Sequence, residues 1–181
     1  MFPLFALWVA YCRYLIIKEE WIVKSVIIYA TKYGAAEKAA NMLKEKLKGQ
    51  VTMVNLTKEK VPSLEEYDNV ILGGSIYVGK IQKQLTNYIK ANLPELLKKR
   101  TGLFICAALN EPEKLIKELS DAFPEELANK AVAKEVFGYE FSFEKMGFID
   151  KMMTKSIVGI KSSISSLEKE TIEKFAEAMN S

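Results

Sequence analysis

Short apolar runs recur along the chain, and segments in which apolar residues return every three or four positions lie between them. The runs predict strands at Val26–Ala30, Val51–Leu56, Asn69–Gly73, Gly102–Ala108 and Ala131–Gly138. The helical spacing predicts helices at Ala36–Leu47, Gln82–Leu97, Pro112–Phe123 and Glu168–Met179. This alternation indicates an α/β protein in which a doubly wound, five-stranded parallel sheet lies between two layers of helices.

The segment 139–166 does not fit this alternation, because a connection of a few residues is usual before the last helix. We interpret it as an insertion. Four apolar residues return in it at helical spacing with lysines among them: Ile149, Met153, Ile157 and Ile160. Such a basic amphipathic helix fits three roles: packing on its own domain, contact with a membrane or quinone through residues 141–160, or a homodimer interface.

The first 22 residues form a separate apolar extension before the domain at 23–181. Met1–Ile17 is interrupted only by Arg13 and precedes Lys18-Glu19-Glu20. It lacks the features of a secretory signal, and its length is marginal for a membrane span. It is a membrane anchor, a helix packed on the domain, or a non-native translation. We favour the last, because codons for Lys-Glu-Glu can form a bacterial ribosome-binding sequence ahead of a start at Val23.

Composition narrows the function classes. The chain has 181 residues, of which 49% are hydrophobic, and a net charge of +3. Lysine and glutamate are interleaved, so the dense basic surface of a nucleic-acid-binding protein is absent from the sequence. Histidine is absent too, which removes the commonest metal ligand and general base. Cys12 and Cys106 provide no zinc spacing, and Cys106 is expected in the core, in a cytoplasmic protein.

The main candidate for chemistry is the segment between the first strand and the first helix, Thr31-Lys32-Tyr33-Gly34-Ala35-Ala36. A buried strand, a small loop with a glycine and a helix N-terminus form a phosphate-binding geometry, although the segment is also compatible with a turn that binds nothing. If the strand order is 2-1-3-4-5, the loop at 73–80 faces the same ligand, because strands one and three flank the switch point.

Several phosphate-binding motifs are excluded. The loop has neither the Gly-Lys-Ser/Thr ending of a Walker A motif nor the three glycines of a dinucleotide fingerprint. A receiver domain would need an acidic residue after the third strand, where this chain has Gly73-Gly74. These absences argue against nucleotide triphosphates and classical dinucleotides.

The loop Thr-x-Tyr-Gly-x-Ala after Ile-Ile-Tyr resembles the FMN phosphate loop of flavodoxins, and the resemblance extends from about Val23 to the C-terminus. Within that family the chain is most similar to the menaquinone-dependent protoporphyrinogen dehydrogenase type. Two segments are similar to that group: Val70–Lys80 and the insertion around Gly138–Ile157. The resemblance therefore implies a flavodoxin-like fold and FMN as the cofactor.

The resemblance also assigns site residues. Thr31, Lys32, Tyr33, Gly34, Ala35 and Ala36 would hold the FMN phosphate. The two sides of the isoalloxazine would be lined by Gly74, Ser75, Ile76, Tyr77, Val78 and Gly79, and by Ala108, Leu109, Asn110 and Glu111. Flavodoxins often have threonine at the position of Ala36, so one hydroxyl donor to phosphate is missing here, worth about 1–2 kcal/mol if unreplaced. Tyr77 is either a cover for the flavin or an ordinary loop aromatic.

The expected function is therefore an FMN-binding redox protein that resembles quinone-dependent protoporphyrinogen IX dehydrogenase, with a redox partner or quinone as electron acceptor. An electron-transfer flavodoxin is the alternative, although the basic charge differs from the acidic electron carriers. A non-flavin interaction module that uses the apolar insertion is an alternative of another class. A cytoplasmic protein, peripheral to the membrane if the insertion binds it, is expected.

Overall fold

The computed structural model of the protein describes residues 22–108, 111–157 and 162–181. The predictions for the apolar N-terminal extension, for Leu109 and Asn110 and for Ile160 concern positions outside these ranges. Within them, no helix is both long enough and apolar enough to cross a membrane.

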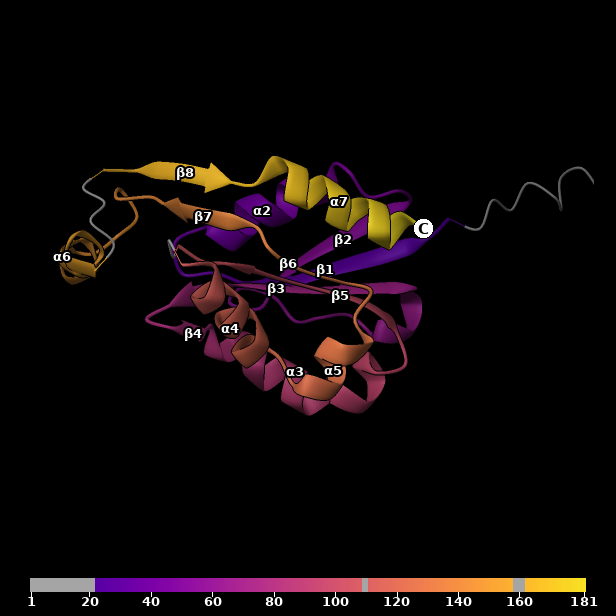
Figure 1. Cartoon of the computed structure of the whole chain (residues 1–181). Helices are drawn as coiled ribbons and strands as arrows, with labels where there is room; N and C mark the ends of the chain where they lie inside the picture. The colour runs from indigo at the N-terminus through magenta and orange to yellow at the C-terminus, as the bar shows by residue number, and fades with distance from the viewer. Residues whose placement is uncertain (1–21, 109–110, 158–161) are drawn as a thin grey trace, which may run out of the picture.

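A twisted parallel sheet forms the centre of the domain (Figure 1). Its strand order is β2-β1-β3-β5-β6, which confirms the predicted 2-1-3-4-5 topology. The strands have the bounds β1 Lys24–Ala30, β2 Gln50–Asn55, β3 Asn69–Tyr77, β5 Arg100–Cys106 and β6 Ala133–Val136. The short β4 (Lys80–Ile81) pairs with β3 in the antiparallel direction.

Helices cover both faces of the sheet, as Figure 1 shows: α2 (Ala35–Lys44) and α7 (Lys169–Asn180) on one face, and α3 (Lys83–Leu96), α4 (Pro112–Ala122) and α5 (Glu125–Lys130) on the other. A short 3₁₀ turn, Leu64–Glu66, precedes β3, and the Ser63 hydroxyl accepts a hydrogen bond from the Glu65 N–H. These layers confirm the predicted three-layer architecture, to which α5 is an unpredicted addition.

The sheet is buried on both sides because successive side chains of a strand point to opposite faces. Val26 and Ile28 of β1 pack in the cluster under α3 and α4. Ile27 and Tyr29 pack in the other cluster, against α2 and α7. The continuous apolar runs in the sequence are the consequence of this two-sided burial.

The predicted loop at 73–80 is wrong for most of its residues, because 73–77 belong to β3 and Lys80 belongs to β4. β3 continues to Tyr77, and only Val78 and Gly79 form the turn to β4. Backbone pairing of Ile76 with Ile81 and of Tyr77 with Lys80 extends the strand, a non-local gain that a local apolar pattern does not reveal.

The insertion has its own secondary structure. β7 (Gly138–Phe141) and β8 (Ile164–Leu167) form an antiparallel ribbon, and α6 (Phe148–Ile157) lies between them in the chain. Figure 1 shows the ribbon extending beyond the sheet, with α6 at its far end. The ribbon is tied to α2 because the Lys38 ammonium lies 2.5 Å from Glu140 Oε2.

Gly73 makes close packing of β3 and β5 possible, and we expect Gly73→Ala to destabilise the fold. A Cβ at Gly73 would lie 2.0 Å from Cζ of Phe104, whose side chain is fully buried. Overpacking of this kind costs about 1–3 kcal/mol of unfolding free energy. Urea denaturation measures the change, and Gly147→Ala is the control, since a Cβ there meets nothing within 4 Å. An equal stability of the two variants would contradict the packing argument.

Candidate functional site

The site begins at the turn between β1 and α2. Gly34 is the N-cap of α2 and has a φ of 100°, a left-handed conformation that other residues adopt only with strain. Its N–H donates to Oγ1 of Thr31 at 3.0 Å. The backbone therefore turns tightly at Gly34 and leads directly into the positive end of the helix dipole.

Ser75 completes this turn from the neighbouring strand. Ala30 of β1 is paired with Gly74 of β3, so the next residues, Thr31 and Ser75, emerge side by side. Their hydroxyl oxygens lie 3.0 Å apart, and the Ala36 N–H donates to the Ser75 hydroxyl at 3.3 Å. Two hydroxyls thus lie together at the first turn of α2. Hydroxyl donors at a helix N-terminus suit a phosphate, because the helix dipole favours negative charge there.

The missing hydroxyl at Ala36 has a structural reason. The Ala36 side chain is fully buried and packs in the cluster of Ala39 and Ala40, so only its backbone N–H faces the turn. The Ser75 hydroxyl contacts that same N–H. The resemblance assigned Ser75 to the lining beside the isoalloxazine. The structure places its hydroxyl at the turn, next to the N–H of Ala36, and Ser75 also lines the adjoining hollow.

A cationic and aromatic cluster lies next to the turn. The Lys32 ammonium is 3.8 Å from the ring centroid of Tyr77 and 5.1 Å from that of Tyr33. The two rings meet edge to face, with centroids 6.4 Å apart. Burial works to lower the pKa of Lys32, but hydrogen bonds with Tyr77 and Asp150 outweigh it, and the pKa is raised. Lys32 is therefore a permanent positive charge at neutral pH.

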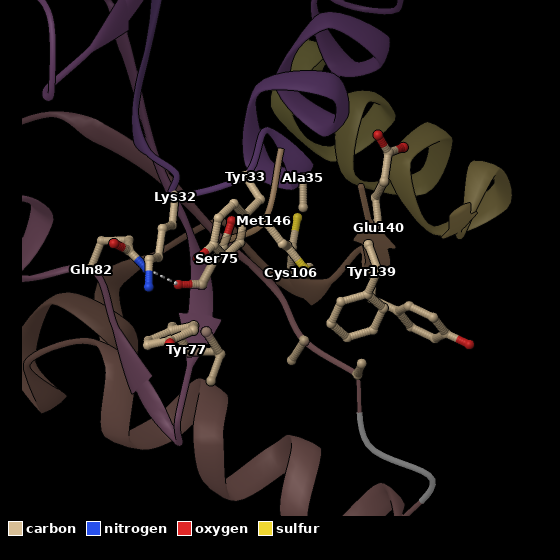
Figure 2. A pocket seen from close by; sticks show the side chains of 14 residues that line it. Lys32, Tyr33, Ala35, Ser75, Tyr77, Gln82, Cys106, Tyr139, Glu140 and Met146 are labelled. Carbon is tan, nitrogen blue, oxygen red and sulfur yellow. Dashed lines mark hydrogen bonds between the residues drawn. The ribbon is translucent and has the colours of Figure 1, made fainter. Parts of the chain in front are cut away.

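A small, open hollow of about 70 Å³ extends from this cluster under the insertion. Figure 2 shows Lys32, Tyr33, Ser75, Tyr77 and Gln82 on one side of it and Tyr139 and Glu140 on the other. Its other lining residues are mostly apolar: Ala35, Ile76, Cys106, Ala107, Ala108, Phe141 and Met146.

The thiol in this lining is not a nucleophile. Cys106 is 3% exposed, and burial, with the charge of Glu140 adding to it, raises the pKa of its thiol far above the usual range. Because the thiolate is the reactive form, Cys106 is a small core residue, as its apolar surroundings in the sequence predicted.

The structure brings together some of the predicted site residues and separates others. Lys32, Tyr33, Ala35, Ser75, Ile76, Tyr77 and Ala108 line the hollow, and Thr31, Gly34 and Ala36 join it through the turn. Val78 and Gly79 are exposed and lie outside the lining, as does Glu111, which pairs with Lys114 at 2.7 Å. Leu109 and Asn110 are outside the described residues.

Gly74 has a packing role that was not expected. A Cβ at this position would lie 2.8 Å from Cγ1 of Ile81 and 3.2 Å from Cδ2 of Leu85. Gly74 is buried between β4 and α3, and the absence of a side chain lets Ile81 and Leu85 pack against it in the core beneath the hollow.

Sequence reasoning missed the contribution of the insertion to the site. Tyr139, Glu140, Phe141 and Met146 line the hollow, and the Asp150 carboxylate accepts hydrogen bonds from Lys32, Tyr33 and Tyr77. The only sequence feature that pointed to this contribution was the high density of apolar residues at 141–146. Phe141 and Met146 pack on their own domain, one of the three interpretations, whereas Phe148, Ile149 and Met152 remain exposed.

Fold and site together define a doubly wound α/β protein with a hydroxyl-lined glycine turn at the start of α2 and an aromatic hollow at the switch point of its sheet. A model of the flavodoxin domain matches residues 26–166. The chain therefore belongs to the flavodoxin domain family.

Solved structures agree on the fold. A short-chain flavodoxin associated with a non-canonical PDU bacterial microcompartment has a TM-score of 0.56 at 18% identity, covering 87% of this chain and 96% of that one. A flavodoxin of Streptococcus pneumoniae TIGR4 has a TM-score of 0.54 at 18% identity, covering 87% and 97%. An oxidoreductase of Corynebacterium diphtheriae has a TM-score of 0.54 at 11% identity, covering 88% and 95%. Among curated proteins, none matches the chain.

Proposed function

We propose that the protein binds FMN non-covalently and transfers electrons through it. The observation that carries this proposal is the meeting of the Thr31 and Ser75 hydroxyls at the N-terminus of α2, beside an aromatic hollow in a flavodoxin domain. A phosphate suits the first feature, and the apolar and aromatic side chains of the second suit contact with a flat ring.

The donor chemistry of the turn fits an FMN phosphate. Thr31 and Ser75 offer hydroxyls, the backbone of residues 32–36 offers N–H groups, and the dipole of α2 favours negative charge. Lys32 adds a positive charge. Ala35, Ile76, Ala108 and Tyr77 would contact the ring system, where removal of apolar surface from water favours binding.

The flavin, when bound, supplies the redox chemistry, and the protein supplies binding, orientation and electrostatics. No histidine is present in the sequence. The polar side chains that line the hollow are Lys32, Tyr33, Ser75, Tyr77, Gln82, Tyr139 and Glu140. Tyr33 and Tyr77 carry hydroxyl protons in this lining, so proton movement would involve these tyrosines or water.

The finer proposal is protoporphyrinogen IX dehydrogenation with a quinone as acceptor. It rests on the similarity of Val70–Lys80 and of the insertion to the menaquinone-dependent type. An electron-transfer flavodoxin is the alternative that uses the same site. An interaction module without flavin is the alternative that uses the exposed apolar residues of α6 in place of the hollow.

The partner proposed for α6 is an anionic membrane surface, where a quinone would be met. Phe148 is 80% exposed, Ile149 69% and Met152 59%, and Lys151 and Lys155 lie on the same short helix. Apolar side chains beside lysines favour binding to anionic lipids, and a homodimer is the alternative occupant of the same surface.

The purified protein is expected to show flavin absorbance and to release FMN on denaturation. Thr31→Ala and Ser75→Ala should each weaken FMN binding about tenfold, because each removes a hydroxyl worth about 1–1.5 kcal/mol from the phosphate site. Titration of the apoprotein with FMN, followed by quenching of flavin fluorescence, gives the dissociation constants.

The matched control is Ser120→Ala, since Ser120 is exposed on α4 and lines no part of the hollow. Its affinity for FMN should equal that of the wild type. A colourless protein that takes up no added FMN would overturn the proposal and favour the interaction module.

An anaerobic assay with protoporphyrinogen and a menaquinone analogue separates the dehydrogenase from the electron carrier. If the protein is a dehydrogenase, porphyrin fluorescence should appear only with the quinone present and should rise with protein concentration. A flavin that is reduced by a flavodoxin reductase but never by protoporphyrinogen would favour the electron carrier.

Binding to vesicles tests the partner of α6. The protein should sediment with vesicles rich in phosphatidylglycerol and much less with phosphatidylcholine alone. Phe148→Ser should weaken sedimentation several-fold, because it removes the most exposed of the apolar side chains described in α6. If the protein elutes from gel filtration as a monodisperse dimer and sediments with neither kind of vesicle, the result would favour a homodimer interface at α6.

A further inference from the structure

Asp150 connects the insertion to the turn and to the hairpin of β3 and β4. It lies in the first turn of α6, and its side chain is 18% exposed. Its Oδ2 lies 3.0 Å from the Lys32 ammonium and accepts from the Tyr33 hydroxyl, while Oδ1 accepts from the Tyr77 hydroxyl. One carboxylate therefore joins three side chains that are separated from it by more than 70 positions in the sequence.

The same three side chains are expected to meet the flavin. In the arrangement with Asp150 the rings of Tyr33 and Tyr77 are inclined by 66°, and the Lys32 ammonium lies over the face of Tyr77. A flat ring that stacks on Tyr77 needs that face free. A ring stacked on the face of Tyr77 that Lys32 covers would therefore displace Lys32 from its position beside Asp150.

Among the side chains of α6 that the structure describes, Asp150 makes the contacts with the turn and the hairpin. Among the side chains described in this helix none is buried, and Phe148, Ile149, Met152, Lys155 and Ser156 are exposed. Hydrogen bonds to a carboxylate from an ammonium and two hydroxyls are among the stronger kinds, and partial burial limits their screening. Loss of the Asp150 contacts would therefore free α6 from the site.

We propose that Asp150 is a positioning residue that competes with the flavin for Lys32, Tyr33 and Tyr77. Its carboxylate holds α6 over the site when no flavin is bound. Flavin binding then requires that Asp150 leaves, which also releases α6 with its exposed apolar residues. This inference rests on the proposed FMN site, and it makes cofactor binding and the position of the insertion mutually dependent.

The first test measures FMN association and dissociation rates with the apoprotein. Asp150→Ala should speed association about tenfold and leave dissociation nearly unchanged, since the fraction of molecules with a free site rises. Asp150→Asn should lie between Asp150→Ala and the wild type, because the amide oxygen still accepts from a tyrosine but the charge facing Lys32 is gone. Faster dissociation without faster association would overturn the competition.

The control is Glu144→Ala, which removes the same charge from the same insertion at an exposed position away from the hollow. Its rates should match those of the wild type. Equal acceleration in Glu144→Ala would assign the effect to net charge and would overturn the role of Asp150.

The second test compares proteolysis of the apoproteins and then adds FMN. Trypsin should cleave the wild-type apoprotein after Lys151 and Lys155 more slowly than Asp150→Ala, and mass spectrometry identifies these cuts. FMN should accelerate them in the wild type but not in Asp150→Ala. Equal cleavage of the two apoproteins would overturn the attachment of α6 by Asp150.

The two tests separate failure of this proposal from failure of the FMN site. If the wild type and Asp150→Ala bind FMN at equal rates, the proposed competition between Asp150 and the flavin is wrong, while the FMN site remains supported. If neither protein binds FMN, the FMN site and the competition both fail, while the cleavage rates of the apoproteins still report whether Asp150 holds α6.

Discussion

The parallel register of β1 and β3 is the constraint on which the site depends. Pairing of Ala30 with Gly74 makes Thr31 and Ser75 neighbours, although 44 positions separate them in the chain. The pairing is held by apolar residues buried on both faces of the sheet, such as Ile27 and Ile28 of β1. Because a parallel sheet places all carboxyl ends at one edge, the energy that packs the core also positions the two hydroxyls at the start of α2.

The insertion adds a second side to this edge of the sheet. Its ribbon brings Tyr139 and Phe141 into the lining of the hollow, and the ion pair between Lys38 and Glu140 ties the ribbon to α2. Beyond the ribbon, none of the side chains described in α6 is buried, and Asp150 makes polar contacts with Lys32, Tyr33 and Tyr77. The described part of this helix therefore depends on a few polar contacts, in contrast to the buried sheet beneath it.

The chemistry available to the site follows from what its side chains are. Burial keeps the Cys106 thiol protonated, and contacts with Tyr77 and Asp150 keep Lys32 charged, so neither group acts as a nucleophile or base at neutral pH. What remains is a set of donors for an anion and an apolar, aromatic surface for a ring. Such a set binds and orients a cofactor that brings its own reactivity.

The sequence by itself determined the strands of the sheet, the helical layers and the position of the turn after β1, because two-sided burial and amphipathic periodicity leave strong local patterns. The expected strand order came with the resemblance to flavodoxins, and the structure confirms it. Only the tertiary structure decided the rest. It extended β3 through pairing with β4, used Ser75 at the turn where Ala36 points into the core, and brought Asp150 to Lys32. These outcomes depend on contacts between distant residues, and a local hydrophobic pattern carries no information about which distant polar groups will meet.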